Sequence, residues 1–174
     1  IDSKLCSIET PGTIVVAPDG MHISAQPAVQ NASAREIIQC VSGERAVMSG
    51  RINLQGDLVA HGSVDDLTNT LRGNLSIVAR KGRIYRSNLF TNILSFLSVR
   101  NLILGRKADI AKKGFAYRSF SINGAFHGKT FKIHEGVLDS NTLSLACEGT
   151  YNLSNKRIDL TVLATPFQIY DLVL

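Results

Sequence analysis

The chain has 174 residues, of which 44% are hydrophobic and 19% are charged. This length allows one moderately large domain, which would bury well over half of the surface that its unfolded form exposes. The composition excludes a disordered tail. The most apolar window, 89–104, is interrupted by polar residues and falls short of the roughly 18 to 20 apolar residues that a membrane-spanning helix needs. Because the chain begins at Ile1 and stops within an apolar stretch, we expect a piece of a longer protein, whose anchor could lie upstream.

The net charge of +5 comes from one segment in the middle of the chain. Residues 80–118 hold ten of the 19 basic residues and one of the 14 acidic residues, a net charge of +9. An anionic partner would therefore meet the protein there. The interpretations left open are an anionic lipid surface, a solvated face, and nucleic acid, for which nearby aromatic residues at 85, 115 and 117 could stack on bases.

The first half of the sequence alternates with period two, which predicts strands. Two such strands flank the turn Pro18-Asp19-Gly20, and further strands are expected over 51–60 and 74–82. Gly56 is a candidate bulge or bend. Two short helices are expected, over 34–41 with Ser33 as the N-cap and over 64–71.

A longer helix is expected from Ser87 to about Leu104. Its apolar residues recur at helical spacing and its polar residues fall on the opposite face, so the predicted helix is amphipathic. Its apolar face includes Leu89, Ile93, Phe96 and Leu97.

The C-terminal third predicts four antiparallel strands joined by hairpins, over 118–126, 130–138, 142–153 and 156–166. The stretch GAFHGKT, 124–130, has the composition of a phosphate-binding loop but not its spacing, and no helix follows it. We therefore predict a hairpin turn at this position.

Nothing in the sequence supports an enzyme, a metal site or a cofactor. The four histidines, His22, His61, His127 and His134, lack ligand spacing, and no nucleophile or dinucleotide motif is present. Among the three cysteines, Cys147 lies on the apolar side of an alternating run. Cys6 and Cys40 could form a disulfide, typical of an oxidising compartment, or could remain two buried thiols.

Residues 71–166 contain, in order, the basic turn KGRIYRS, the apolar segment LFTNILSFLSV, the strand GFAYRSFSINGAF, a GVL strand and the hairpin GTYNLSNKRIDLTV. This order resembles the C-terminal region of the AsmA-like family of Gram-negative envelope proteins. Residues 1–62 resemble the preceding β-repeat part less specifically, so 1–174 is interpreted as a single β-rich domain. The resemblance implies a non-enzymatic periplasmic protein, anchored in the inner membrane, whose apolar groove carries phospholipids.

We therefore expect a mainly β fold: an antiparallel, strongly twisted sheet forming a half-barrel or taco-like groove, with one long amphipathic helix and one or two short helices. The predicted lipid-groove residues are Leu75, Ile77, Phe120, Ile122, Phe126, Phe131, Ile133, Leu143, Leu145, Ile158, Leu160 and Val162. The basic residues expected to face head groups or a membrane are Arg83, Arg86, Arg100, Arg106, Lys107, Lys112 and Lys113.

Two alternatives remain open at this point. The predicted groove residues could instead pack against one another in a closed core. The domain could also be a structural or protein-interaction module whose sheet edges pair with neighbouring domains of the same long chain. The expected partners are phospholipids or a membrane surface, and no nucleic acid is expected.

Overall fold

The computed structural model describes residues 2–6, 8–18, 20–42, 47–85, 114–141 and 143–166. In these ranges the fold is mainly β, as predicted. The strands are β1 (Asp2–Leu5), β2 (Ile8–Ala17), β3 (Gly20–Ala25), β4 (Ala28–Ser33), β5 (Arg51–Gly62), β6 (Arg72–Ile84), β7 (Phe115–His127), β8 (Thr130–Asp139), β9 (Leu143–Asn152) and β10 (Ile158–Pro166). Two helices accompany them, α1 (Ala34–Ser42) and α2 (Leu67–Thr70).

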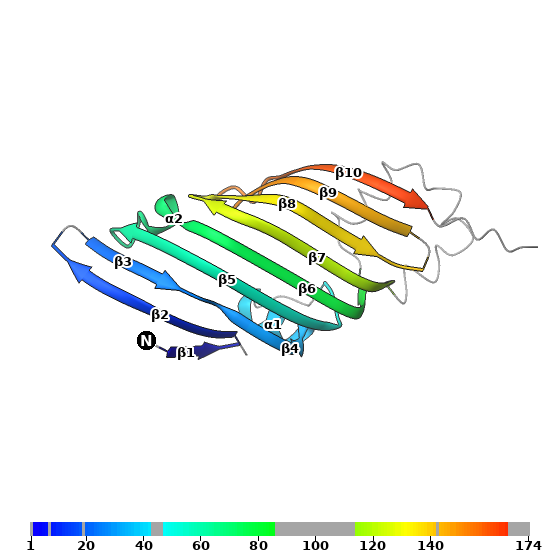
Figure 1. Cartoon of the computed structure of the whole chain (residues 1–174), viewed down its shortest axis with the longest axis horizontal. Helices are drawn as coiled ribbons and strands as arrows, with labels where there is room; N and C mark the ends of the chain where they lie inside the picture. Colours follow the sequence, from blue (N-terminus) through cyan, green and yellow to red (C-terminus); the bar gives the residue numbers. More distant parts are fainter. Residues whose placement is uncertain are drawn as a thin grey trace, which may run out of the picture.

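All of these strands belong to one antiparallel sheet, in the order β1-β2-β3-β5-β6-β7-β8-β9-β10 (Figure 1). The remaining strand, β4, pairs with β2 and β5. β3 pairs with the C-terminal half of β5 and β4 with its N-terminal half, so the two occupy a single position in the sheet. The break between them falls at Gln26 and Pro27, where proline lacks the N–H that a central strand needs.

The four-stranded C-terminal meander is confirmed. β7, β8, β9 and β10 are sheet neighbours in chain order, as expected for strands joined by short turns. His127 pairs with Thr130 across the turn at Gly128 and Lys129. Gly128 has a φ of 59°, a conformation that glycine adopts at little cost. GAFHGKT is therefore a hairpin turn.

The helix predictions have three outcomes. The helix expected over 34–41 is present as α1. The second is shorter than predicted: residues 64–66 form a turn, and only the four residues of α2 are helical. The long amphipathic helix expected over 87–104, with Leu89, Ile93, Phe96 and Leu97, lies outside the described residues.

The alternation of side chains along β8 is interrupted by a bulge that was not predicted from the sequence. Asn123 pairs with Glu135, but the next residue of β7, Gly124, pairs with Ile133, so His134 is extra. The pairing with β9 shows the same shift between Ile133 and Gly136. One additional residue changes the side-chain parity of a strand, so Gly136 returns to the face of Ile133.

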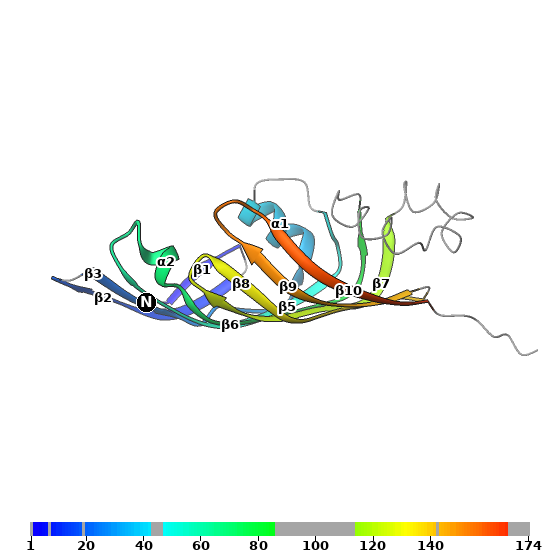
Figure 2. The ribbon, with the colours of Figure 1, turned by 90° about the horizontal axis from the view of Figure 1, so that it is seen from above.

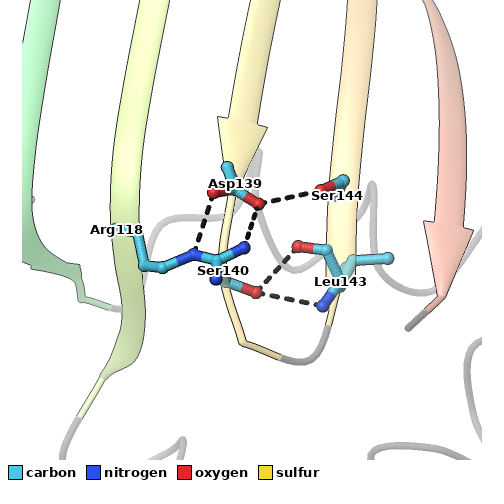
Figure 3. A network of polar contacts seen from close by, with 5 residues as sticks. All are labelled: Arg118, Asp139, Ser140, Leu143 and Ser144. Carbon is cyan, nitrogen blue, oxygen red and sulfur yellow. Dashed lines mark hydrogen bonds and ion pairs between the residues drawn. The ribbon is translucent and has the colours of Figure 1, made fainter. Parts of the chain in front are cut away.

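The turn that joins β8 to β9 is fixed by polar contacts (Figure 3). Arg118 on β7 forms a two-point ion pair with Asp139, with Nε–Oδ2 at 2.9 Å and Nη2–Oδ1 at 2.8 Å. Ser144 Oγ donates to the same carboxylate at 3.0 Å. These hydrogen bonds, that of Arg118 foremost, hold the pKa of Asp139 below its usual range. The ion pair and the hydrogen bond from Ser144 together link three adjacent strands, β7, β8 and β9, at one end of the sheet.

Ser140 closes the same turn through two hydrogen bonds to the backbone of Leu143. Its side chain is 1% exposed, and its Oγ donates to Leu143 O at 2.7 Å and accepts from Leu143 N at 3.0 Å. In the Ser140→Ala variant the buried Leu143 N–H would lose its acceptor, which costs about 1–3 kcal/mol. We expect urea denaturation to report this loss of unfolding free energy. A matched Asn141→Ala substitution, at the exposed next position, should leave the midpoint unchanged; equal midpoints for both variants would contradict the assignment.

The buried core lies where α1 packs on the sheet. Ile37 of α1, 7% exposed, joins residues from β4, β5, β6, β7, β8 and β9 in one cluster. Figure 2 shows α1 on one side of the sheet, with the ends of β6 and β7 near residues 84 and 115 bending toward that side. The members of the buried cluster are Val29, Ala34, Ile37, Ile52, Ala79, Phe115, Tyr117, Leu138, Leu143 and Leu145. The short helix thus covers only part of a large apolar face.

Tyr117 places a hydroxyl group in this core. It is 4% exposed, and its Oη donates to Ser49 O at 2.5 Å. Burial raises the pKa of Tyr117 to about 12. Glycine is required beside it, because a Cβ at Gly50 would lie 2.7 Å from the hydroxyl oxygen and one at Gly82 2.5 Å from it.

Cys6 and Cys40, whose pairing the sequence left open, form a disulfide in the structure. Their Cα atoms are 5.6 Å apart, which is a normal separation for a disulfide. Cys6 lies in the turn between β1 and β2, and Cys40 lies on α1. The disulfide therefore ties the first hairpin of the sheet to the helix that packs on the core.

Candidate functional site

Cross-strand register lines up apolar residues on the face that α1 partly covers. In antiparallel sheets, directly paired residues project to the same side. One such row runs from β5 to β10 through Leu54, Ile77, Ile122, Gly136, Cys147 and Val162. A second row runs through Gly56, Leu75, Gly124, Ile133, Gly149 and Leu160. The apolar face is thus continuous across six strands.

A hollow of about 430 Å³ lies on this face. Nine of the predicted groove residues line it. They come from five strands, β6 to β10, and are Ile77, Phe120, Ile122, Phe131, Ile133, Leu145, Ile158, Leu160 and Val162. Apolar lining and this volume are typical of small-molecule sites, which range from about 300 to 1,000 Å³.

The other three predicted residues lie elsewhere on the sheet. Leu143 is 2% exposed and belongs to the core cluster beside α1. Phe126 packs against Phe131, with ring centroids 4.7 Å apart. Leu75 pairs with Gly56 and Gly124 in the second row. These three side chains extend the apolar surface but are not among the residues that line the hollow.

Several lining residues were missed by the sequence reading. Val47, Met48 and Ile84 come from the segment before β5 and from the end of β6, where the period-two signal is weak. Tyr151 and Cys147 join from β9. Cys147 was expected on the apolar side of its strand and is half-buried there, and its burial raises the pKa of the thiol.

Glycines leave space for the large side chains of this face. A Cβ at Gly124 would lie 2.6 Å from Phe131 Cζ, and one at Gly136 would lie 2.5 Å from Cys147 Sγ. Any larger residue at these positions would displace the lining of the hollow. The glycines therefore act by removing side-chain volume from the sheet surface. Around Gly124 the register of β7 with β6 is regular, whereas Gly136 directly follows the bulge of β8.

A polar cluster lies next to the lining residues Val47, Met48 and Ile84. Tyr85 Oη donates to Ser49 Oγ at 3.3 Å and accepts from Arg35 Nη2 at 3.2 Å. Arg83 N donates to the same Ser49 Oγ at 3.2 Å. We call Arg35, Ser49, Arg83 and Tyr85 the arginine cluster.

Only one of the predicted head-group residues falls in the described part of the chain. Arg83 lies near the end of β6, and its Nη1 donates to Gly114 O at 3.3 Å. The other six lie outside the described residues: Arg86, Arg100, Arg106, Lys107, Lys112 and Lys113.

Two histidines lie on the opposite, polar face of the sheet. His22 on β3 pairs directly with His61 on β5, and their rings stack with centroids 6.1 Å apart. Within the described ranges, no group of three or more His, Cys, Asp or Glu side chains could hold a metal ion.

Comparison of the chain with models of known families, with curated proteins and with solved structures found no match. The resemblance to the AsmA-like family therefore stays a prediction from the order of motifs. No helix in the described part of the chain is long and apolar enough to cross a membrane.

Proposed function

We propose that the chain is a non-enzymatic lipid-binding domain that holds a phospholipid acyl chain in the hollow. The observation that carries the proposal is the hollow of about 430 Å³. Its lining is apolar and comes mainly from strands β6 to β10. The face would act as the wall of a half-barrel or taco-like groove. Its role would be lipid transfer in outer-membrane maintenance.

The size of the hollow suits about one acyl chain. An apolar protein cavity of about 150 Å³ takes up benzene, which has six carbon atoms. By the same ratio, 430 Å³ accommodates about 17 carbon atoms. Transfer of an acyl chain with about 15 methylenes from a bilayer to water costs about 12 kcal/mol of free energy, at about 0.8 kcal/mol per methylene. Contacts with the apolar lining of the hollow would offset much of that cost.

The disulfide supports the proposed compartment. Disulfides persist in the periplasm and other oxidising compartments, and are rare in the reducing cytosol. The bond between Cys6 and Cys40 therefore favours an oxidising compartment, which agrees with the proposed periplasmic location. An anchor of the full-length protein in the inner membrane is proposed from the AsmA-like resemblance alone.

A second candidate is a structural module that pairs with neighbouring domains. It is favoured by β10, which ends the sheet within the described ranges and carries Leu163, 71% exposed. Unpaired strand edges accept further strands. In that case the hollow would be an incidental feature of the sheet.

Native mass spectrometry of the purified chain separates the two candidates. We expect a population with the added mass of one phospholipid, and solvent extraction should recover that lipid. Lipid-free protein that also takes up none after incubation with phosphatidylglycerol and phosphatidylethanolamine vesicles would contradict lipid binding and favour the module.

A further inference from the structure

The arginine cluster joins a charged group on α1 to the end of β6. Arg35 Nη2 donates to Tyr85 Oη, and the Arg35 Cζ atom lies 5.7 Å from the centroid of the Tyr85 ring. Tyr85 in turn donates to Ser49 Oγ. The guanidinium of Arg35 is thus positioned by a hydrogen bond and a cation–π contact, both from a neutral partner.

The cluster adjoins segments that line the hollow. Ser49 directly follows Met48, and Tyr85 directly follows Ile84, and both preceding residues line the hollow. Tyr85 N donates to Val47 O at 2.8 Å, which holds the two segments together. The charged groups and the apolar lining therefore belong to the same pair of segments.

The cluster is electropositive. Among the described residues, the recorded contacts of the Arg35 guanidinium are with Tyr85 and include no carboxylate. The hydrogen bond with Ser49, together with Arg35 and Arg83, holds the pKa of Tyr85 below its usual range. A guanidinium group binds phosphate and carboxylate oxygens through paired N–H donors, and Arg35 is exposed on the surface of α1.

We propose that the arginine cluster binds the anionic head group of the lipid whose acyl chain fills the hollow. This inference rests on the proposed function. Arg35 supplies a fork of N–H donors to the head-group oxygens, while Arg83 adds positive charge. Tyr85 holds Arg35 beside the segments that line the hollow. The preferred ligand is therefore an anionic amphiphile rather than a neutral one.

The test compares two lipids with the same palmitoyl chain, lysophosphatidylglycerol and monopalmitoylglycerol, by titration calorimetry below their critical micelle concentrations. For the unaltered chain we expect the anionic lipid to bind at least about tenfold more tightly, since hydrogen bonds to charged groups are the stronger class. The Arg35→Gln variant should lose most of that preference and keep its affinity for monopalmitoylglycerol. Arg35→Lys should restore it in part.

The matched control is Arg51→Gln, an exposed arginine of β5 whose guanidinium donates to Asn31 O at 3.1 Å. The Arg51→Gln variant should bind both lipids with the affinities of the unaltered chain. The circular dichroism spectra of all variants should match that of the unaltered chain. Equal binding of both lipids by the unaltered chain, or equal loss in both arginine variants, would overturn the head-group site and leave lipid binding intact. Binding of neither lipid would overturn both proposals. Binding of glycerol 3-phosphate as tightly as the lysophospholipid would show a free-phosphate site and overturn the lipid assignment.

Discussion

Replacing Leu160 and Val162 together by Asp is expected to abolish phospholipid loading while the chain still folds. Both residues lie on β10, line the hollow and are only partly buried, so the fold can accommodate the change. Each loses an aliphatic contact worth about 1.5–3 kcal/mol to a bound chain. Two such losses weaken binding by about a hundredfold or more, because each 1.4 kcal/mol is about a factor of ten. The measurement is phospholipid per protein after vesicle incubation, by extraction and native mass spectrometry.

The same strand offers a matched control one residue out of phase. Thr161 and Leu163 alternate with Leu160 and Val162, so they project from the opposite face, and both are exposed. The Thr161→Asp, Leu163→Asp variant carries the same added charge on the same strand and should load lipid normally. If both double variants load lipid equally, the hollow is not the lipid site. If both lose it, the effect comes from strand charge or stability.

Most strands could be predicted because half-buried strands alternate. Ile52 and Leu54 in β5, and Leu75 and Ile77 in β6, repeat with period two. The structure pairs Leu54 directly with Ile77 across the two strands. β4 could not be predicted in this way. Its sequence AVQNAS is mixed, with Asn31 at a φ of 49°, and its strand conformation comes from pairing with β5.

The position of the hollow was only partly predictable, since it depends on register. The bulge at His134 keeps Phe131, Ile133, Gly136 and Leu138 on one face. The sequence carries a weak signal for it, the spacing of three between Ile133 and Gly136, which is hidden because glycine has no apolar side chain.

Gly56, expected as a bulge or bend, shows a different role. The register of β5 with β6 continues through it without a shift. A Cβ there would lie 3.0 Å from both Pro27 Cγ and Leu75 Cδ1, so the glycine makes room for neighbouring side chains. Sequence alone cannot separate these roles, since both remove a side chain from a strand.

The arginine cluster shows why polar sites are hard to predict from one sequence. Arg35 lies on a short helix, fifty residues before Tyr85, and nothing in its local pattern indicates a contact. Backbone pairing brings the segments together: Met48 pairs with Ile84, and Ala34 N donates to Gly50 O. The prediction of a basic region was based on local density of charge and so included Arg83 but not Arg35.

The Cys6→Ser, Cys40→Ser variant should be substantially less stable, with unchanged lipid loading. The two cysteines are 34 residues apart in the chain. A disulfide that closes such a loop restricts the unfolded state by about 4 kcal/mol at 25 °C. For a domain of this size, about 4 kcal/mol corresponds to a decrease in melting temperature of about 10 °C. The hollow should survive because its lining residues all lie beyond residue 46.

Thermal denaturation followed by circular dichroism, with and without a reducing agent, checks this prediction. Reduction should lower the melting temperature of the unaltered chain to that of the double variant, and should not lower the variant further. The control is Cys147→Ala, which removes the free thiol and should keep the full response to reductant. A melting temperature that is independent of reductant in the unaltered chain would show that Cys6 and Cys40 are not joined, and would also remove the structural support for an oxidising compartment.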